Sequence, residues 1–295
     1  MVMKKIWELD FYSRPNFFKH NKKLWEVLIC ETPMYSNKSF NDCFKFSQLC
    51  PSSTVNSIWL RQAIEKAMKK AGESPDLIRF FRFQMQNMII KACKDAEIEA
   101  IPSRRTFALN YWIDKREKQF KLVKNRINNT VSTINRTDTD SQMVSLPDTL
   151  KDNQFSKYFC VDLKVSDFNH IDEWDIGFGE NYAISPYGLS SHTIIPGLVF
   201  FSPRALPIAA WLSGFELVSL RFDRKNSSTL YLETGLNDKS VLINLNDIRL
   251  IQEAKNFERK KENSKGIHFL AIQPSPDVEL FSGFWLLKDE LISRI

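Results

Sequence analysis

The sequence predicts an α+β protein of two α+β domains joined by a flexible linker. Short runs of alternating apolar residues indicate strands, and other runs repeat at helical spacing. A chain of 295 residues is long enough for two domains of ordinary size. Between residues 125 and 142, twelve of eighteen residues are Asn, Ser, Thr or Asp, which cannot bury an apolar face. We therefore place the domains at residues 1–122 and 152–295, with the linker at 123–151.

The N-terminal domain is predicted element by element from its apolar pattern. Ile6 to Tyr12 alternates apolar and polar residues, which is typical of a half-buried strand, and Ser13 to Asn16 is expected to end it. Ser57 to Ala71 is striped like a helix, and Gly72 is placed to stop it. The other predicted elements are strands at Leu24–Glu31, Phe44–Leu49, Leu77–Phe83 and Glu99–Ile101, a helix from Met85, and a helix from its cap Ser103 to about Lys118. This βββαβα succession is a ribonuclease H-like order of elements.

The C-terminal domain is predicted in the same way. Ser202 can cap a helix with Pro203 at its first position and Gly214 at its end. A charged helix is expected from Asn246 to about Asn263. The predicted strands are Tyr158–Val165, Leu198–Phe201, Glu216–Phe222, Thr229–Glu233, Ser240–Asn244, His268–Gln273 and Phe281–Leu287.

One spacing occurs in both domains: Ser103, Arg105, Leu109 and Trp112 repeat as Ser202, Arg204, Ile208 and Trp211. Duplication or two independent helices with serine caps would both produce it, and we favour independent helices.

Charge is divided unequally between the domains. Residues 1–120 hold 21 Lys and Arg against 13 Asp and Glu, a net charge of +8. Residues 151–295 hold 16 against 19, a net charge of −3. A basic excess confined to one domain favours a polyanionic partner there, although a solvated lysine surface would give the same count.

Cysteine and apolar content indicate the cellular compartment. The five cysteines form no CxxC pair and the four histidines are scattered, so we expect free thiols, a reducing compartment, no metal and no cofactor. No apolar run reaches the roughly 20 residues that span a bilayer. Because Trp7-Glu8-Leu9-Asp10 comes where a signal peptide would need its apolar region, we expect a cytoplasmic protein with no targeting segment.

The sequence contains few signs of catalysis. It lacks glycine-rich phosphate loops and the HExxH and GxSxG patterns. Glu8 and Asp10 share one face of the first strand, and paired carboxylates could hold Mg²⁺ for a metal-dependent nuclease, which we keep as an alternative. The fourth strand, however, offers Arg79 and Arg82 where a further acid would be needed. We interpret the two carboxylates as exposed, or as partners of Arg14, Arg79 or Arg82.

The stretch from Asp76 to Trp112 combines arginines, aromatic rings and amides, which supply phosphate contacts, stacking faces and hydrogen bonds to bases. Its strand would place Arg79, Phe81 and Phe83 on one face, and some of its phenylalanines must be core. If the strand were central and covered on both sides, its rings would be hidden. The candidate RNA-binding residues are Arg14, Arg79, Phe81, Arg82, Phe83, Gln86, Asn87, Arg104, Arg105 and, in the second domain, Arg204.

Long motifs in both domains resemble the Tab/Atab family of RNA-binding proteins of cyanobacteria and chloroplasts. The motifs are Ile6–Pro15, Lys23–Cys30, Val55–Arg61, Ile78–Met88, Pro102–Leu109, Ile195–Gly197, Ser202–Trp211, Leu232–Leu236, His268–Pro274 and Phe281–Leu287. The resemblance is weakest in the linker, which is often proline-rich in relatives and is rich in Asn and Thr here.

The resemblance implies a protein that is not an enzyme and that binds A/U-rich single-stranded RNA. The expected target is the 5′ leader of messages for photosystem reaction-centre subunits, chiefly of photosystem I, whose translation the protein would promote. It also implies a role in photosystem biogenesis in the cyanobacterial cytosol, or in the stroma for plastid relatives. An alternative is an assembly scaffold that binds translation or photosystem-assembly proteins, for instance through Pro196–Leu212.

Overall fold

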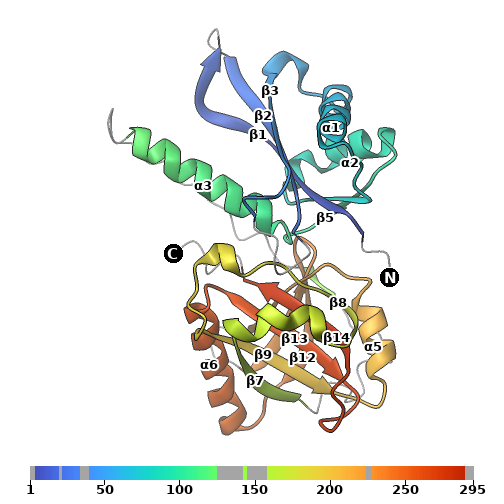
Figure 1. Ribbon diagram of the computed structural model, residues 1–295, viewed down its shortest axis with the longest axis vertical. Coiled ribbons are helices and arrows are strands. Elements are labelled where there is room, and N and C mark those ends of the chain that lie inside the picture. Colours follow the sequence, from blue (N-terminus) through green and yellow to red (C-terminus); the bar gives the residue numbers. More distant parts are fainter. Residues whose placement is uncertain are drawn as a thin grey trace. The chain divides into compact units, whose positions relative to one another are not determined.

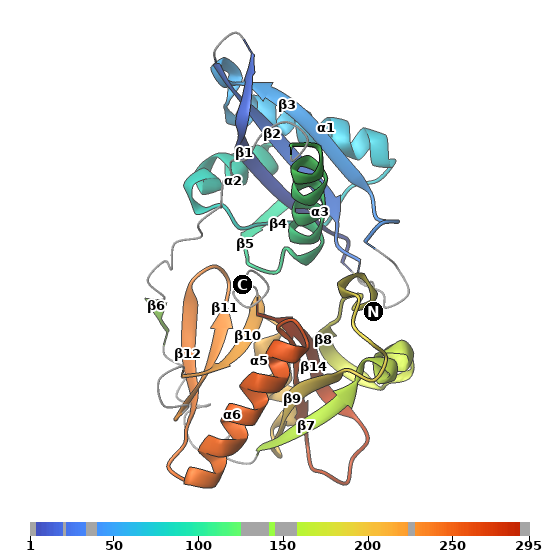
Figure 2. The same ribbon diagram turned by 90° about the vertical axis from the view of Figure 1, so that its left-hand side faces the viewer.

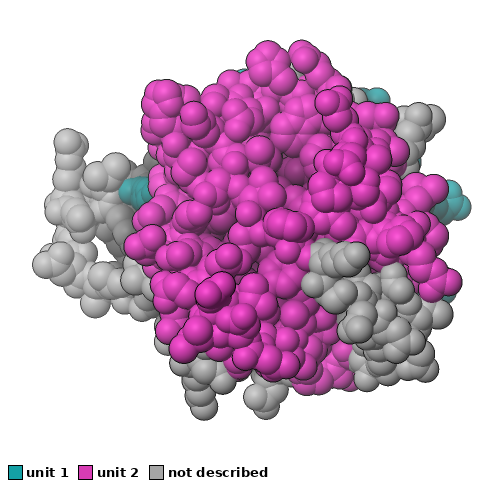
Figure 3. All heavy atoms as spheres, turned by 90° about the horizontal axis from the view of Figure 1, so that it is seen from below, with its two compact units in different colours: residues 1–33, 40–138 teal, residues 34–39, 139–295 magenta. Residues whose placement is uncertain are grey.

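The computed structural model describes residues 4–19, 22–33, 40–124, 142–144, 158–223 and 228–289. The chain forms two compact units, which Figure 3 colours separately. Unit 1 comprises Met1–Pro33 and Phe40–Asp138, and unit 2 comprises Met34–Ser39 and Thr139–Ile295. Each unit has its own hydrophobic core. Both units combine sheets with helices, which confirms the α+β class.

Unit 1 is built on one five-stranded mixed sheet in the order β3-β2-β1-β4-β5 (Figure 1). The strands are β1 (Ile6–Lys19), β2 (Lys22–Glu31), β3 (Lys45–Pro51), β4 (Leu77–Phe80) and β5 (Glu99–Pro102). β2 is antiparallel to both of its neighbours, β1 and β3, whereas β4 pairs in parallel with β1 and β5 pairs in parallel with β4. The predicted ribonuclease H-like order of elements is confirmed, including the short strand at β5.

Helices cover both faces of this sheet. The helices are α1 (Ser57–Ala71), α2 (Gln86–Asp95) and α3 (Phe107–Lys124). Trp7, Leu9 and Phe11 point to one face and form the core with α1 and α2. Glu8 points to the opposite face, where its carboxylate contacts the first turn of α3. In Figure 1, α3 accordingly lies on the other side of the sheet from α1 and α2.

Unit 2 contains two sheets, with the orders β10-β11-β12-β6 and β7-β9-β13-β14-β8. Its strands are β6 (Gln142–Met143), β7 (Tyr158–Lys164), β8 (Ile176–Glu180), β9 (Ile194–Phe201), β10 (Leu217–Phe222), β11 (Thr229–Thr234), β12 (Asp238–Asn244), β13 (Ile267–Gln273) and β14 (Phe281–Lys288). Its α-helices are α5 (Ala205–Leu212) and α6 (Ile248–Asn263). Both helices contact the five-stranded sheet. In the described residues, no helix is both long and apolar enough to cross a membrane.

Short 3₁₀ turns occupy several connections. They are Ser52–Thr54, Phe83–Met85, Val165–Glu173 and Ser185–Tyr187. The turn at Phe83–Met85 matters most here, because it joins β4 to α2.

Three elements of unit 1 have different bounds from those predicted, and β4 is the first, because it ends at Phe80 instead of Phe83. β1 continues beyond Pro15, because a register shift between Ser13 and Phe18 lets the strand accommodate the proline. α3 begins at Phe107 instead of after Ser103, and it extends to Lys124. Gln142 and Met143, within the predicted linker, pair in parallel with β12. The linker limits 123–151 stay a prediction; within them, residues 123–124 belong to α3 and residues 142–143 form β6.

The repeated serine spacing corresponds to a repeated turn. In each unit a serine follows the end of a strand and its hydroxyl accepts the N–H two residues later: Ser103 from Arg105 at 3.0 Å, and Ser202 from Arg204 at 3.1 Å. Each serine N–H also donates to the last carbonyl of the parallel neighbouring strand, Phe80 or Gln273. Neither serine is a helix N-cap, so these predicted caps were wrong.

Candidate nucleic-acid interface

The carboxylate of Glu8 lies beneath the first turn of α3, not at the surface. Its Oε2 accepts the N–H of Leu109 at 2.7 Å, and its Oε1 accepts the hydroxyl of Thr32 at 2.9 Å and the N–H of Ala108 at 3.4 Å. The first amides of a helix have no partner inside the helix. Glu8 therefore acts as a capping residue, although it comes from a strand far away in the sequence.

Burial raises the pKa of Glu8 to about 7. The hydrogen bonds from Leu109 and Thr32 and the positive charge of Arg79 oppose this rise only in part. The contact between β1 and α3 therefore contains a carboxyl group that changes charge near neutral pH.

Asp10 forms a two-point ion pair with Arg82. Nε of Arg82 lies 2.7 Å from one carboxylate oxygen of Asp10, and Nη2 lies 2.8 Å from the other. The Asp10 side chain is 2% exposed and that of Arg82 is 27% exposed. The guanidinium carbon also lies 5.5 Å from the ring centre of Phe81 and 5.7 Å from that of Tyr12. Arg82 is thus held rigidly, with part of its guanidinium facing solvent.

Glu26 is a third buried acid on this face of the sheet. It accepts hydrogen bonds from the Ser47 hydroxyl at 2.6 Å, from Nη2 of Arg116 in α3 at 2.8 Å, and from the Tyr12 hydroxyl at 3.0 Å. The second of these contacts also ties α3 to the sheet.

The structure corrects our interpretation of Glu8 and Asp10 as exposed, because both are buried. The predicted partnership of Asp10 with Arg82 is confirmed. Protein donors engage both carboxylates, and within the described ranges no group of three His, Cys, Asp or Glu residues could hold a metal ion. No observation therefore favours the nuclease alternative.

Phe83 presents a large apolar ring at the surface. Its residue is 64% exposed, although it lies between a fully buried strand and a helix. The backbone is fixed by a 3₁₀ turn in which the N–H of Met85 donates to the carbonyl of Arg82 at 3.1 Å. Gln84 and Asn87 are exposed beside it in the sequence. A solvent-facing ring on a hydrogen-bonded turn, next to amides, suits the stacking of an unpaired base.

The carboxyl ends of the parallel strands β4 and β5 bring a second arginine to this region. The N–H of Ser103, just after β5, donates to the carbonyl of Phe80 at the end of β4 at 2.8 Å. The half-buried Arg104 follows Ser103 directly, as Phe81 follows Phe80. Ligands commonly bind at the carboxyl ends of parallel strands. We call Phe81, Arg82, Phe83, Gln84, Asn87 and Arg104 the β4-end surface.

Burial overturns two of the predicted RNA contacts. Arg79 is 3% exposed and pairs in register with Glu8, and Arg105 is 2% exposed beside the ring of Phe107. Both were predicted from the chemistry of the residues between Asp76 and Trp112, but α3 covers the face to which Arg79 points. These two guanidinium groups lie in the interior of unit 1 and do not form a surface.

The remaining predicted contacts divide as follows. Phe81 and Gln86 are half-buried near Phe83. The side chain of Arg14 lies outside the described part of the chain. Arg204 is exposed just before α5, in the other unit. The structure thus groups part of the set and leaves Arg14 and Arg204 as separate predictions.

Comparisons with known proteins identify the family. Residues 6–116 match the family description "RNA-binding protein Tab2/Atab2 N terminal", and residues 134–288 match the C-terminal domain of the same family. The chain belongs to the Tab2/Atab2 family.

Two plant members are similar along nearly the whole chain. The TAB2 homolog of Arabidopsis thaliana, described as chloroplastic, is 33% identical over 306 residues, which cover 97% of this chain and 75% of the plant protein. The chloroplastic TAB2 homolog of Zea mays is 32% identical over 292 residues, covering 96% and 71% respectively. The β4-end surface lies entirely inside the Tab2/Atab2 N-terminal match.

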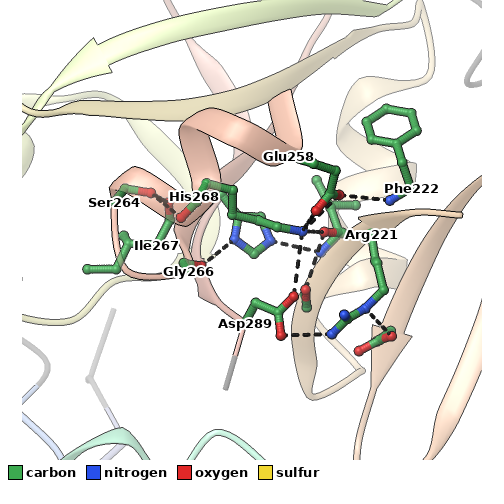
Figure 4. Close-up of polar contacts among 12 residues, drawn as sticks. Arg221, Phe222, Glu258, Ser264, Gly266, Ile267, His268 and Asp289 are labelled. Carbon is green, nitrogen blue, oxygen red and sulfur yellow. Dashed lines mark hydrogen bonds and ion pairs between the residues drawn. The ribbon is translucent and has the colours of Figure 1, made fainter. Parts of the chain in front are cut away.

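Unit 2 contains a buried charge network that sequence reasoning missed (Figure 4), and all of it except Asp289 lies inside the Tab2/Atab2 C-terminal match. Arg221 in β10 donates to Glu233 at 2.9 Å and to Asp289 at 2.7 Å. Lys261 in α6, which is fully buried, donates to the Leu220 carbonyl at 2.9 Å and lies 3.6 Å from Asp289. These cations are enclosed by acids and are not available to an external anion.

His268 completes this Tab2/Atab2 network as a neutral side chain. Burial and the neighbouring Lys261 lower its pKa to about 3. Its Nε2 accepts the N–H of Leu220 at 2.8 Å, so Nδ1 carries the proton and donates to the Gly266 carbonyl at 2.8 Å. The network joins β10, β11, α6, β13 and the residue after β14. Only the mixture of polar residues in otherwise apolar strands could have indicated it.

Proposed function

We propose that this protein binds single-stranded, A/U-rich RNA through the β4-end surface. In this proposal Phe83 stacks on a base, Arg82 and Arg104 contact the phosphate backbone, and Gln84 and Asn87 hydrogen-bond to base edges. The observation that carries the proposal is the 64% exposure of Phe83 on a hydrogen-bonded turn in a protein of an RNA-binding family. Stacking on an aromatic side chain contributes about 1–3 kcal/mol per base.

Charge supports RNA as the partner of unit 1. Residues 1–120 carry a net charge of +8, and unit 1 contains most of them. The ion pair with Asp10 neutralises much of the charge of Arg82, so this arginine acts mainly as an oriented hydrogen-bond donor. Long-range attraction of RNA then comes from the other basic residues of the unit.

We further propose the biological role that the family resemblance implies. The target is the 5′ leader of photosystem messages, chiefly those of photosystem I, and binding promotes their translation and photosystem biogenesis in the cyanobacterial cytosol, without catalysis. Crosslinking the protein to RNA in cells and sequencing the bound RNA tests this. Enrichment of such leaders supports the proposal, whereas recovery of RNA without leaders or A/U bias contradicts it.

A protein partner is a second proposal, for which the surface of α5 is the relevant observation. Leu206 is 58% exposed and Phe215, just after the helix, is 41% exposed. Exposed apolar residues on an apolar helix are typical of protein contacts. Retention of ribosomal or photosystem-assembly proteins in a pull-down after ribonuclease treatment would support this proposal. If ribonuclease treatment removes all such proteins from the pull-down, they were retained through RNA, and the proposal of a direct protein partner fails.

A further inference from the structure

We propose that the solvent face of α6, in unit 2, is a second RNA-binding surface that holds the phosphate backbone of a single strand. This inference rests on the proposed RNA-binding function and extends it to the C-terminal domain. It is carried by the way in which α6 distributes its charged residues around its axis.

The charges of α6 that point toward the sheets are all engaged. Lys261 is fully buried and bonds to Glu258 at 2.8 Å, and Glu258 also accepts the N–H of Phe222 at 2.9 Å. Lys260 forms an ion pair with Asp162 in β7. Of the three acids of the helix, Glu258 lies on this inner side, and Glu253 is exposed but lies toward β7, where it raises the pKa of Tyr158 and Cys160.

The outer face of α6 is basic and rich in amides. Arg249, Lys255 and Arg259 are exposed, and none forms an ion pair within the described ranges. Gln252 and the half-buried Asn256 lie between them, and Nη2 of Arg259 is 3.4 Å from the amide oxygen of Asn256. α6 packs against β9 and β13 of one sheet and β10 of the other, and Figures 1 and 2 show it at the edge of unit 2.

This distribution is not the one that solubility alone favours. Lys255 and Arg259 are four residues apart, where like charges destabilise a helix by about 0.2–0.5 kcal/mol. Residues 151–295 carry a net charge of −3, so this face has the opposite sign to its own domain. A polyanion bound along the face would remove the repulsion.

The length and chemistry of the face fit a nucleic-acid strand. Arg249 and Arg259 are separated by about 15 Å along the helix axis, from the rise per residue of an α-helix. Cations spaced over that length can contact successive phosphates, and the amides between them can bond to sugar hydroxyls or base edges. Ile248, which is 82% exposed at the first turn, offers an apolar contact at one end.

A pair of charge-reversing substitutions that change the net charge equally tests where the RNA binds. Glu262 is the one exposed acid on the outer side of α6, and Glu279 is an exposed acid in the loop between β13 and β14. We expect Glu262→Lys to tighten binding of a labelled single-stranded RNA made only of A and U by about threefold and to steepen its salt dependence. Glu279→Lys, with the same change in net charge, should leave both nearly unchanged.

Removal of cations gives the converse test. Arg249→Gln with Arg259→Gln should weaken binding of the same RNA by about tenfold and reduce the log–log salt slope by about 0.7 for each phosphate that the variant no longer neutralises. Thermal unfolding of both variants checks that α6 is intact. Equal effects of the two Glu→Lys substitutions, or a wild-type slope in the folded double variant, would overturn the inference.

The outcomes separate this inference from the proposed function. If the wild-type protein binds no single-stranded RNA, both fail. If Phe83→Ala weakens binding while the α6 variants bind like the wild type, only the inference about α6 fails.

Discussion

Arg82 and Asp10 join the end of β4 to the centre of β1 through two hydrogen bonds, of 2.7 Å and 2.8 Å. The pair occupies the place where carboxylates alone would have suggested a metal site. It leaves one edge of a fixed guanidinium toward solvent, next to the exposed Phe83. A buried acid on β1 thus orients a surface donor that lies two residues beyond the end of β4.

Loss of Arg82 should destabilise unit 1. Arg82→Ala leaves Asp10, which is 2% exposed, without its guanidinium partner, and we expect the free energy of unfolding to fall by about 2–3 kcal/mol. The double variant Asp10→Asn with Arg82→Gln keeps the net charge and allows amide pairing, so it should recover most of the loss. Urea unfolding measures both, and a single variant as stable as the wild type would contradict the structural role of the pair.

Glu8 should give unit 1 a characteristic pH dependence. Because its pKa in the folded state is raised from 4.5 to about 7, the folded protein keeps a proton that the unfolded chain releases. Stability from this group therefore falls as pH rises from about 4.5 to about 7, by about 3 kcal/mol in all.

Glu8→Gln provides the control for that prediction. The amide keeps the size of the side chain, can accept the N–H of Leu109 and does not titrate. The difference in unfolding free energy between wild type and variant should change across this pH range. The contributions of other titrating groups, such as His268, are the same in both proteins and cancel in this difference. A difference independent of pH would show that Glu8 titrates normally.

Phe83 should contribute to RNA binding without contributing to stability. We expect Phe83→Ala to weaken binding of A/U-rich single-stranded RNA by about 1–3 kcal/mol, the usual contribution of one stacked base. Ile58→Ala is a matched control, because Ile58 is an apolar residue of the same unit that is 61% exposed on α1. Fluorescence anisotropy compares them, and equal affinities of the two variants would remove Phe83 from the interface.

Substitution of two adjacent lysines, Lys260 and Lys261, should lower the stability of unit 2 by very different amounts. Lys261→Met removes a fully buried cation and leaves Asp289 and the Leu220 carbonyl without it, so we expect a loss of about 3–5 kcal/mol. Lys260→Met breaks only the partly exposed pair with Asp162, which should cost less than about 1 kcal/mol. Similar melting temperatures for both variants would contradict the network.

The order of elements in unit 1 could be predicted because its strands and helices have clear apolar periods. The strand Ile6–Tyr12 and the helix Ser57–Ala71, closed by Gly72 in the left-handed region (φ 75°), needed only local information. Local information failed where a distant residue determines the structure. The start of α3 depends on Glu8, which no pattern near Phe107 reveals.

The influence of distant residues also explains why some of the predicted RNA-binding residues are buried and others are exposed. Alternation along β4 predicted that Arg79, Phe81 and Phe83 share a face, but the strand ends at Phe80 and the alternation ends with it. Whether an arginine is buried depends on what covers its face, and α3 covers Arg79. Composition indicated the stretch of chain that holds the proposed β4-end surface, while the choice of residues within it required the tertiary structure.

RNA contact at the β4-end surface is the proposal on which the others depend, and locating a crosslink is its sharpest test. The purified full-length protein would be irradiated with A/U-rich single-stranded RNA, and the peptides carrying nucleotide adducts would be identified by mass spectrometry. We expect an adduct on Phe83 or its immediate neighbours from Phe81 to Asn87. Adducts found only outside this segment and outside Arg104, in a protein that binds the RNA, would contradict the proposal.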